Sequence, residues 1–167
     1  VKTFQGVSSN NELSSQYSVR GGSYDENSVY VNGIEVYRPY LVRTGEQEGL
    51  SFVNPDLVGN VEFTAGGFDS RYGDKLSSVL DITYRKPMSF EAGIAGSFMG
   101  ATAYIGSSNE KYSQIHGIRY KNASWLLGTL QTNAEYDPNF LVYQTYITYK
   151  PHEKVELALL ANLSQNT

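Results

Sequence analysis

The sequence predicts a mainly β protein, in which a small domain with a short mixed sheet precedes a β-meander that begins a transmembrane β-barrel. Two observations predict the β class. No apolar stripe with the 3.6-residue period of a helix lasts three turns, whereas Tyr, Val, Ile and Thr are abundant and Gly recurs. In the second half of the chain, large apolar residues alternate with small or polar ones at a period of two, which is typical of strands.

Composition limits the function classes. The 167 residues suffice for one ordinary domain or two small ones. The net charge of −4 argues against general nucleic-acid binding, because phosphate neutralisation needs a basic surface. The absence of Cys excludes disulfide scaffolds, thiol catalysis and Cys-based zinc sites. No signal peptide opens the chain and Val1 starts within a pattern, so we expect a piece of a longer protein.

The first part of the chain, residues 1–87, reads as short strands joined by turn-rich loops. Its strongest signal is Asn32-Gly33 between two alternating runs, because a type I′ hairpin turn needs positive φ at both central residues. Two short windows have helical character, residues 4–13 and the turn after Asn54, which is a potential N-cap. The expected strands are 17–20, 28–37 around the turn, 60–65 and 79–85.

The second part, residues 88–167, reads as a meander of longer strands. Residues 92–109 contain no charge, but the recurrence of Gly there disfavours a transmembrane helix. Within one long strand, the even positions are bulky (Phe90, Ile94, Phe98, Tyr104) and the odd positions are small. The expected strands are 89–106, 111–121, 124–132, 140–149 and 154–165.

The last two expected strands each have one apolar face, formed by alternate residues of 141–149 and 155–163. Tyr143, Tyr149 and Trp125 lie near expected strand ends and suit aromatic girdles at a membrane interface. The connections at 107–110 and 132–139 are expected to be open, and those at 121–123 and 150–153 tight, an alternation typical of transmembrane barrels. A soluble β-sandwich has the same period of two, so patterning alone leaves both architectures open.

Enzyme signals are weak. The sequence contains no metalloprotease, phosphate-loop, calcium-loop or nucleophile-elbow motif. His116 is expected to be a lumen or rim residue and His152 to lie in a turn. The acidic pairs Asp25-Glu26 and Glu46/Glu48 are expected to be solvated or ion-paired. We therefore expect no enzymatic activity, cofactor or metal site.

Two segments carry a family resemblance. The first includes Arg20-Gly21-Gly22 and the run Val29-Tyr30-Val31-Asn32-Gly33-Ile34-Glu35-Val36; the second includes Gly66-Gly67-Phe68-Asp69-Ser70-Arg71-Tyr72-Gly73 and a strand ending at Tyr84. Together they resemble the plug domain of TonB-dependent outer-membrane receptors, particularly the Bacteroidota type. The likeness extends less specifically into 88–167, which resembles the first barrel strands that follow such a plug.

This resemblance implies active uptake of a small ligand or glycan across the bacterial outer membrane, with the plug gating the barrel lumen. It implies contact with outer-membrane lipid and with a TonB-type energy-transducing protein, which we expect to bind a segment that this sequence lacks. Under this interpretation, plug–barrel charge pairing is assigned to Arg20, Arg43, Arg71, Glu46 and Glu48. The plug turn motifs are Gly21, Gly22, Gly33, Gly66, Gly67, Tyr72 and Gly73. The candidate ligand contacts are Tyr24, Tyr37 and Tyr40.

Two other functions remain open at this stage. A soluble β-sandwich that binds carbohydrate would gather its exposed aromatic residues on one accessible face. A hydrolase would need two carboxyl groups about 5–10 Å apart in one cleft. If the chain is the start of a barrel, its two free sheet edges and an exposed apolar face should make it self-associate or need detergent.

Overall fold

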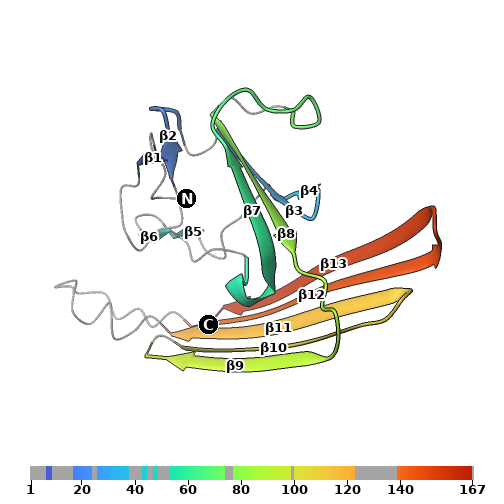
Figure 1. Cartoon of the computed structure of the whole chain (residues 1–167). Helices are drawn as coiled ribbons and strands as arrows, with labels where there is room; N and C mark the ends of the chain where they lie inside the picture. Colours follow the sequence, from blue (N-terminus) through green and yellow to red (C-terminus); the bar gives the residue numbers. More distant parts are fainter. Residues whose placement is uncertain are drawn as a thin grey trace. The chain divides into compact units, whose positions relative to one another are not determined.

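The computed structural model describes residues 7–8, 17–23, 26–37, 43–44, 47–48, 53–73, 77–98, 100–122 and 139–166. The chain divides into two compact units, Val1–Tyr84 and Arg85–Thr167 (Figure 1). The expected domain boundary after Pro87 lies just past this division and stays a prediction. The described residues are mainly in strands, which confirms the predicted β class.

The N-terminal unit contains a four-stranded mixed sheet in the order β4-β3-β8-β7. Its central strands β3 and β8 are parallel, with Val29 opposite Leu80, and the outer pairings are antiparallel. The described residues of this unit also form two two-stranded ladders, β1–β2 and β5–β6. The bounds in the main sheet are β3 Asn27–Val31, β4 Ile34–Glu35, β7 Val58–Thr64 and β8 Ser78–Tyr84. The small ladders are β1 Val7–Ser8 with β2 Ser18–Val19, and β5 Arg43–Thr44 with β6 Gln47–Glu48.

The β3–β4 hairpin turns at Asn32-Gly33, as predicted. Asn32 and Gly33 have φ values of 51° and 78°, which match the type I′ geometry. Val31 lies opposite Ile34 across the turn. The Asn32 side chain also ties the hairpin to β8, because its Oδ1 accepts a hydrogen bond from Tyr84 N at 2.8 Å.

The core of the N-terminal unit gathers around β3 and β8. Leu57 and Val31 are fully buried, and Tyr17 packs edge-to-face against Phe63 with ring centroids 6.0 Å apart. Leu57 ends the 3₁₀ turn η2 (Pro55–Leu57), which the Asn54 side chain caps by accepting from Asp56 N at 3.1 Å. This confirms the predicted turn after Asn54. The helical window expected over 4–13 is wrong at Val7–Ser8, which pair with β2; its other residues lie outside the described part of the chain.

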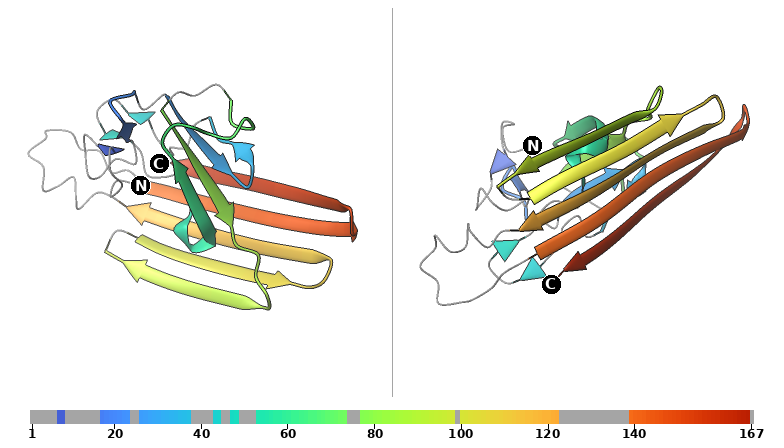
Figure 2. Two further views of the ribbon diagram at one scale, coloured as in Figure 1. Left: turned by 45° about the horizontal axis from the view of Figure 1, so that its top comes forward. Right: turned by 90° about the horizontal axis from the view of Figure 1, so that it is seen from below.

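The C-terminal unit is a single antiparallel sheet in which β9 to β13 follow one another in chain order (Figure 2). Its edges are β9 and β13, so the sheet is open, consistent with the start of a β-barrel. Among the described residues, no helix has the length and apolarity required to cross a membrane. The bounds are β9 Glu91–Ser97, β10 Gly100–Ser108, β11 Tyr112–Asn122, β12 Asn139–His152 and β13 Val155–Asn166.

The long strand expected over 89–106 is wrong, because the chain reverses between Ser97 and Gly100 and forms two strands. Gly100 permits this reversal: its φ is 144°, and an added Cβ would collide with the Tyr120 carbonyl. The reversal changes which residues share a face. Tyr104 therefore lies on the face opposite Ile94, not beside it.

Two further connections differ from expectation. The link between β10 and β11 is tight, because Asn109 Oδ1 accepts from Lys111 N at 3.1 Å and from Tyr112 N at 2.8 Å. β11 ends at Asn122 and pairs directly with β12, which begins at Asn139, so the next strand of the sheet does not follow a tight connection at 121–123. The strand expected over 124–132, with Trp125, lies outside the described part of the chain. The tight turn between β12 and β13 was predicted correctly.

The sheet of the C-terminal unit has two chemically distinct faces. The charged face carries every acidic or basic side chain of strands β9–β13, namely Glu91, Arg119, Lys121, Lys150 and Glu156. The apolar face carries none, and cross-strand register places on it Ile94, Ala101, Ala103, Ile105, Ile118, Tyr120, Leu141, Tyr143, Ile147, Tyr149, Leu157, Leu159 and Leu163. Most of its large residues are exposed; Leu163, for example, has 69% of its surface accessible.

Replacing Asn32 with Ala should destabilise the N-terminal unit, because the variant loses the bond to Tyr84 N and a residue type that tolerates positive φ. We expect the free energy of unfolding, measured by urea denaturation followed by circular dichroism, to fall by about 1–2 kcal/mol. Ile34→Thr, at an exposed position of the same hairpin, is the control and should change it by less than about 0.5 kcal/mol. Equal effects of the two changes would contradict the role of Asn32.

Candidate functional site

The two segments that carry the family resemblance meet in the N-terminal unit. After β2, residues Val19–Gly22 form a turn in which Gly22 N donates to Val19 O at 2.9 Å. Arg20 and Gly21 have φ values of 51° and 79°, again the type I′ geometry. The Arg20 side chain reaches the second segment, where its Nη1 lies beside Gly66: a Cβ added to that glycine would be 3.3 Å away.

A polar seam holds the start of β3 against the start of β8. Ser77 Oγ donates to Glu26 Oε2 at 2.5 Å, and Ser77 N donates to Glu26 O at 3.1 Å. One residue further on, Ser78 Oγ donates to Asn27 Oδ1 at 2.6 Å. Gly22 packs against this seam so closely that a Cβ would overlap the Ser77 and Glu26 side chains. Glycine is therefore required at position 22 by packing, whereas at position 21 it is favoured by positive φ.

Tyr72 ties the second segment to the sheet. Its hydroxyl donates to Asp81 Oδ2 at 2.5 Å, and its ring packs edge-to-face on Tyr30 with centroids 4.9 Å apart. The Arg71 guanidinium lies 4.6 Å from the centroid of the same ring. The hydrogen bond to the Asp81 carboxylate raises the pKa of Tyr72 to about 12, because loss of the phenol proton would place two negative charges together.

The structure thus brings together several of the residues named from the sequence. Among the described residues, neither Arg20 nor Arg71 has a carboxylate within ion-pair distance, and both are exposed. Arg43 lies opposite Glu48 in the β5–β6 ladder, which concerns only their backbones. Tyr37 is 83% exposed. Gly66 and Gly67 have positive φ, and Gly73 does not. The predicted residues Tyr24, Tyr40 and Glu46 lie outside the described part of the chain.

The chain leaves β8 at Tyr84, and its next three residues bind across the sheet of the C-terminal unit. Arg85 Nη2 pairs with Glu91 Oε1 at 3.3 Å, and its guanidinium lies 4.6 Å from the Tyr104 ring centroid. Lys86 Nζ pairs with Glu156 Oε1 of β13 at 2.6 Å. These contacts reach from β9 and β10 at one edge of the sheet to β13 at the other.

The third exit residue, Pro87, is buried against Gly106 of β10, where a Cβ would overlap the proline ring. Glu156 also binds Lys150 Nζ at 3.1 Å. One carboxylate thus joins residues 85–87, here called the exit segment, to β12 and β13. Neither Lys86 nor Glu156 was among the site residues predicted from the sequence. The available signal was the isolation of Glu156 within an otherwise uncharged strand.

His116, expected at the lumen or the rim, lies on the apolar face of the sheet, where the register places it opposite Thr145. Its Nδ1 lies 2.8 Å from both Tyr143 Oη and Thr145 Oγ1, and its Nε2 lies 3.2 Å from Gln114 Oε1. Gln114 Nε2 in turn donates to Ser107 Oγ at 3.1 Å. His152 lies at the end of β12, beside the turn.

The described residues contain no cluster of three or more His, Asp or Glu side chains suited to a metal ion. Glu26, from one of the acidic pairs considered for hydrolysis, is engaged by Ser77. The contacts described above position loops and strands, and none of them aligns a nucleophile with a base.

Comparison with protein families gives one match: residues 1–78 fit the TonB-dependent Receptor Plug Domain. The matched range contains β3, the Arg20 turn, the Tyr72 loop and the seam at Glu26 and Ser77. The sequence of this segment thus matches the plug domain of TonB-dependent receptors. Receptors of this family are transporters of the bacterial outer membrane and not enzymes. Comparison with curated proteins gave no match.

The raised pKa of Tyr72 makes stability depend on alkaline pH. Because the folded-state value of about 12 exceeds the ordinary 10.0, protonated Tyr72 stabilises the fold fully below pH 10.0, and this contribution is lost as the pH rises towards 12. The difference in tyrosinate absorbance between the wild type and Tyr72→Phe should have its midpoint near pH 12. Asp81→Asn should move that midpoint back towards 10.0; a midpoint that stays near 12 in Asp81→Asn would exclude the hydrogen bond as its cause.

The exit segment should be energetically coupled to β13. We expect Lys86→Met and Glu156→Gln to be non-additive, with a coupling of about 0.5 kcal/mol, because partly exposed ion pairs contribute modestly. Urea unfolding of the detergent-solubilised chain measures the two single variants and the double variant. Lys154→Met, in the exposed β12–β13 turn, is the control and should be additive with Glu156→Gln. If Lys86→Met and Lys154→Met show equal coupling to Glu156→Gln, the effect comes from overall charge and not from the Lys86–Glu156 ion pair.

Proposed function

We propose that this chain, whose residues 1–78 are a TonB-dependent receptor plug domain, comprises most of the plug and the first barrel strands of a receptor that takes up a ligand across the bacterial outer membrane. In this proposal the plug gates the barrel lumen. A TonB-type protein supplies the energy, and the receptor is of the Bacteroidota type.

The observation that carries the barrel assignment is the separation of charge in β9–β13. Side chains on successive residues of a strand point to opposite faces. All charged side chains therefore share one face only if each of them occupies the alternating set of positions that points to that face. All of these charges lie on one face, and the other carries large apolar residues together with the uncharged polar side chains of Gln114, His116 and Thr145. A lipid-facing exterior and a polar lumen require this arrangement in a transmembrane barrel.

Strand length and aromatic placement support the same assignment. A strand needs about 9–11 residues to cross the hydrocarbon layer at a tilt of about 45°. β11, β12 and β13 contain 11, 14 and 12 residues. Tyr112 and Tyr149 are paired at one end of the apolar face, and Tyr120 lies towards the other, as aromatic girdles would. The tight β10–β11 and β12–β13 turns lie at one end of the sheet, which we assign to the periplasm.

Roles within the plug follow from exposure. The exposed cations Arg20 and Arg71, together with Arg43, are proposed to pair with carboxylates of the barrel wall, and Glu46 and Glu48 are the candidate counter-charges. Arg suits this task because its guanidinium forms bidentate hydrogen bonds with carboxylates. The exposed Tyr37, with Tyr24 and Tyr40, is a proposed ligand contact. The ligand class in this proposal is a small molecule or glycan.

The soluble carbohydrate-binding sandwich is not favoured. The described C-terminal unit is one sheet and not two packed face to face. Aromatic residues are divided between the plug core, as at Tyr17 and Tyr84, and the two ends of the apolar face, as at Tyr149. A carbohydrate-binding sandwich would have gathered them on one accessible face.

A test of the barrel assignment uses two neighbouring residues of β13 in the whole receptor, reconstituted in bilayers. Spin labels on Leu159→Cys and Ala158→Cys should differ, because Leu159 belongs to the apolar face and Ala158 to the charged face. We expect oxygen, which concentrates in lipid, to relax the label at 159 more strongly. A water-soluble nickel chelate should relax the label at 158 more strongly.

Ile147→Cys and Thr148→Cys on β12 repeat the comparison on the neighbouring strand and serve as the internal control. If the label at 159 is instead the more accessible to the nickel chelate, the sheet lies in water, and the barrel assignment fails.

A further inference from the structure

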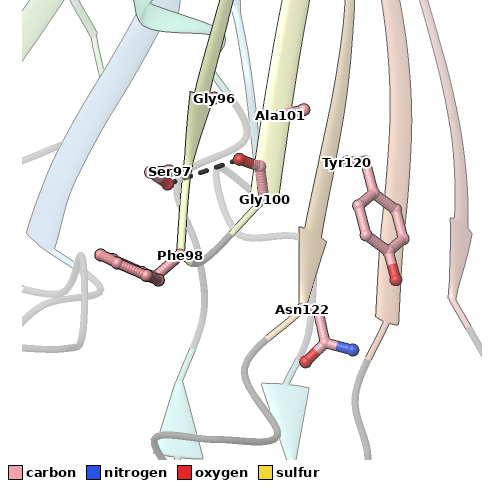
Figure 3. Close-up of a pocket in the computed structure, with 7 residues that line it drawn as sticks. All are labelled: Gly96, Ser97, Phe98, Gly100, Ala101, Tyr120 and Asn122. Atoms are coloured by element: carbon pink, nitrogen blue, oxygen red, sulfur yellow. Dashed lines mark hydrogen bonds between the residues drawn. The ribbon is translucent and has the colours of Figure 1, made fainter.

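Tight connections divide the sheet of the C-terminal unit into two blocks of strands. β9, β10 and β11 follow one another through the reversal at Ser97–Gly100 and the turn at Asn109. Figure 3 shows the first of these, where Ser97 Oγ donates to Gly100 O at 3.4 Å. β12 and β13 are likewise joined by a tight turn. β11 ends at Asn122 and β12 begins at Asn139, so no tight turn sets the register between the two blocks.

The alternation of the two faces restricts this register without determining it. A slip of β12 by one residue along β11 would exchange its apolar and charged faces, and the pattern excludes it. A slip of two residues returns every side chain to its own face, because the side-chain period of a strand is two. The backbone hydrogen bonds of an antiparallel ladder repeat with the same period, so they are also available after such a slip. Specific side-chain contacts must therefore select among registers that differ by two residues.

A polar network on the apolar face crosses the junction between the two blocks. His116 of β11 lies opposite Thr145 of β12, and its Nδ1 lies 2.8 Å from both Thr145 Oγ1 and Tyr143 Oη. The rings of His116 and Tyr143 also stack, with centroids 6.2 Å apart. Gln114 Oε1, 3.2 Å from His116 Nε2, has no proton to donate. His116 Nε2 therefore carries the proton of the neutral ring, and Nδ1 accepts from the two hydroxyl groups of β12.

These contacts form in one register only. After a slip of two residues, His116 would lie opposite Tyr143 or Ile147 in place of Thr145. Thr145 would become a diagonal neighbour about 7–8 Å away, too far for its short side chain to reach the ring. Ile147 offers His116 no hydrogen bond. A ring nitrogen left without a partner on an apolar surface is costly, because no water replaces the lost hydroxyl groups.

Two other groups of contacts join the blocks, and both are less selective. Asn139 Oδ1 accepts from Asn122 Nδ2 at 2.7 Å and from Tyr120 Oη at 2.9 Å, but Asn139 is the first residue of β12 and can adjust with the end of the strand. On the charged face, the exit segment binds one acidic residue of each block through long, partly exposed Arg and Lys side chains. Such side chains can follow a shift of the strands. The His116 ring lies within the paired region and cannot.

We infer that His116, through Thr145 and Tyr143, selects the register of β12 on β11. His116 is a positioning residue in this inference, and it acts through the pairing of the two blocks. The stagger between neighbouring strands sets the tilt and diameter of a closed barrel, so one network would help to define both. The inference rests on the proposed function, because a bilayer withholds the water that would otherwise replace the lost partners.

The test measures the register directly in the whole receptor, reconstituted in bilayers. Spin labels on Ile94→Cys and Leu157→Cys occupy exposed positions of the first and last strands, where the native side chains are 85% and 59% accessible. Ile94 lies in one cross-strand row with Leu163, which is six residues from Leu157. The Cα atoms of the labelled residues are therefore about 28 Å apart. A slip of two residues shortens or lengthens this distance by about 5 Å, which double electron–electron resonance resolves.

The receptor with native His116 should show a single distance. His116→Leu should add a second distance about 5 Å away and change the ratio of the two populations by about tenfold, as expected for the loss of two hydrogen bonds. Thr145→Val removes one of these hydrogen bonds and should act in the same direction with a smaller effect. It provides a second test should His116→Leu fail to fold.

Ile118→Ala is the matched control, because it removes an apolar side chain from the same face of β11, opposite Tyr143, without removing a hydrogen bond. It should weaken the sheet and keep the single distance. A single distance in His116→Leu and Thr145→Val, each folded as judged by circular dichroism, would overturn the inference. A second distance of equal population in Ile118→Ala would do the same, because the effect would then come from general loss of packing.

Failure of this inference leaves the barrel assignment intact if the labels at 158 and 159 distinguish lipid from water. If those labels instead place the face in water, the proposed function itself fails.

Discussion

The parallel pairing of β3 with β8 is the interaction on which the plug unit depends. Parallel strands cannot be joined by a tight turn, so Val31 and Ser78 are joined by a long connection, which itself contains β4 and β7 of the same sheet. The loops that connect β3 to β8 are therefore long, and polar contacts hold them at the two ends of the strand pairing. Ser77 bonds to Glu26 at the start of the pairing, and Asn32 bonds to β8 at its end. The pairing is thus closed at both ends by side-chain hydrogen bonds, which specify its register.

A second constraint acts on β9–β13, where the charged side chains of every strand must point to the same face of the sheet. The exit segment binds to the resulting charged face. Arg85 and Lys86 find carboxylates at opposite edges of the sheet, on Glu91 and Glu156. Exposed ion pairs contribute about 0–1 kcal/mol each, so these two pairs add little to stability. Their main effect is to position the residues that carry them. They hold the first residues after the plug across several strands at once.

Local signals predicted the elements that depend on local physics. The Asn32-Gly33 hairpin and the Asn54 cap were found because turn geometry and capping restrict residue choice at single positions. The prediction of strand boundaries in the C-terminal unit was wrong where a boundary depends on contacts between residues far apart in the sequence. A side chain at position 100 would collide with the Tyr120 carbonyl of the neighbouring strand, and no pattern within 92–109 reveals that close approach. The face on which His116 lies was likewise not predictable, because a face is known only once strands are paired.

The same distinction applies to the candidate site. Glycines and the Tyr72 loop were predicted as turn motifs, but the partners Asp81, Ser77 and Glu26 were not, since they are ordinary polar residues far away in sequence. Their hydrogen bonds contribute about 0.5–1.5 kcal/mol each, less than burial of one large apolar side chain. Loop contacts of the plug can therefore separate while the core around Val31 and Leu57 stays packed. In the proposed receptor the plug gates a lumen and has to rearrange without unfolding, and this order of strengths permits that.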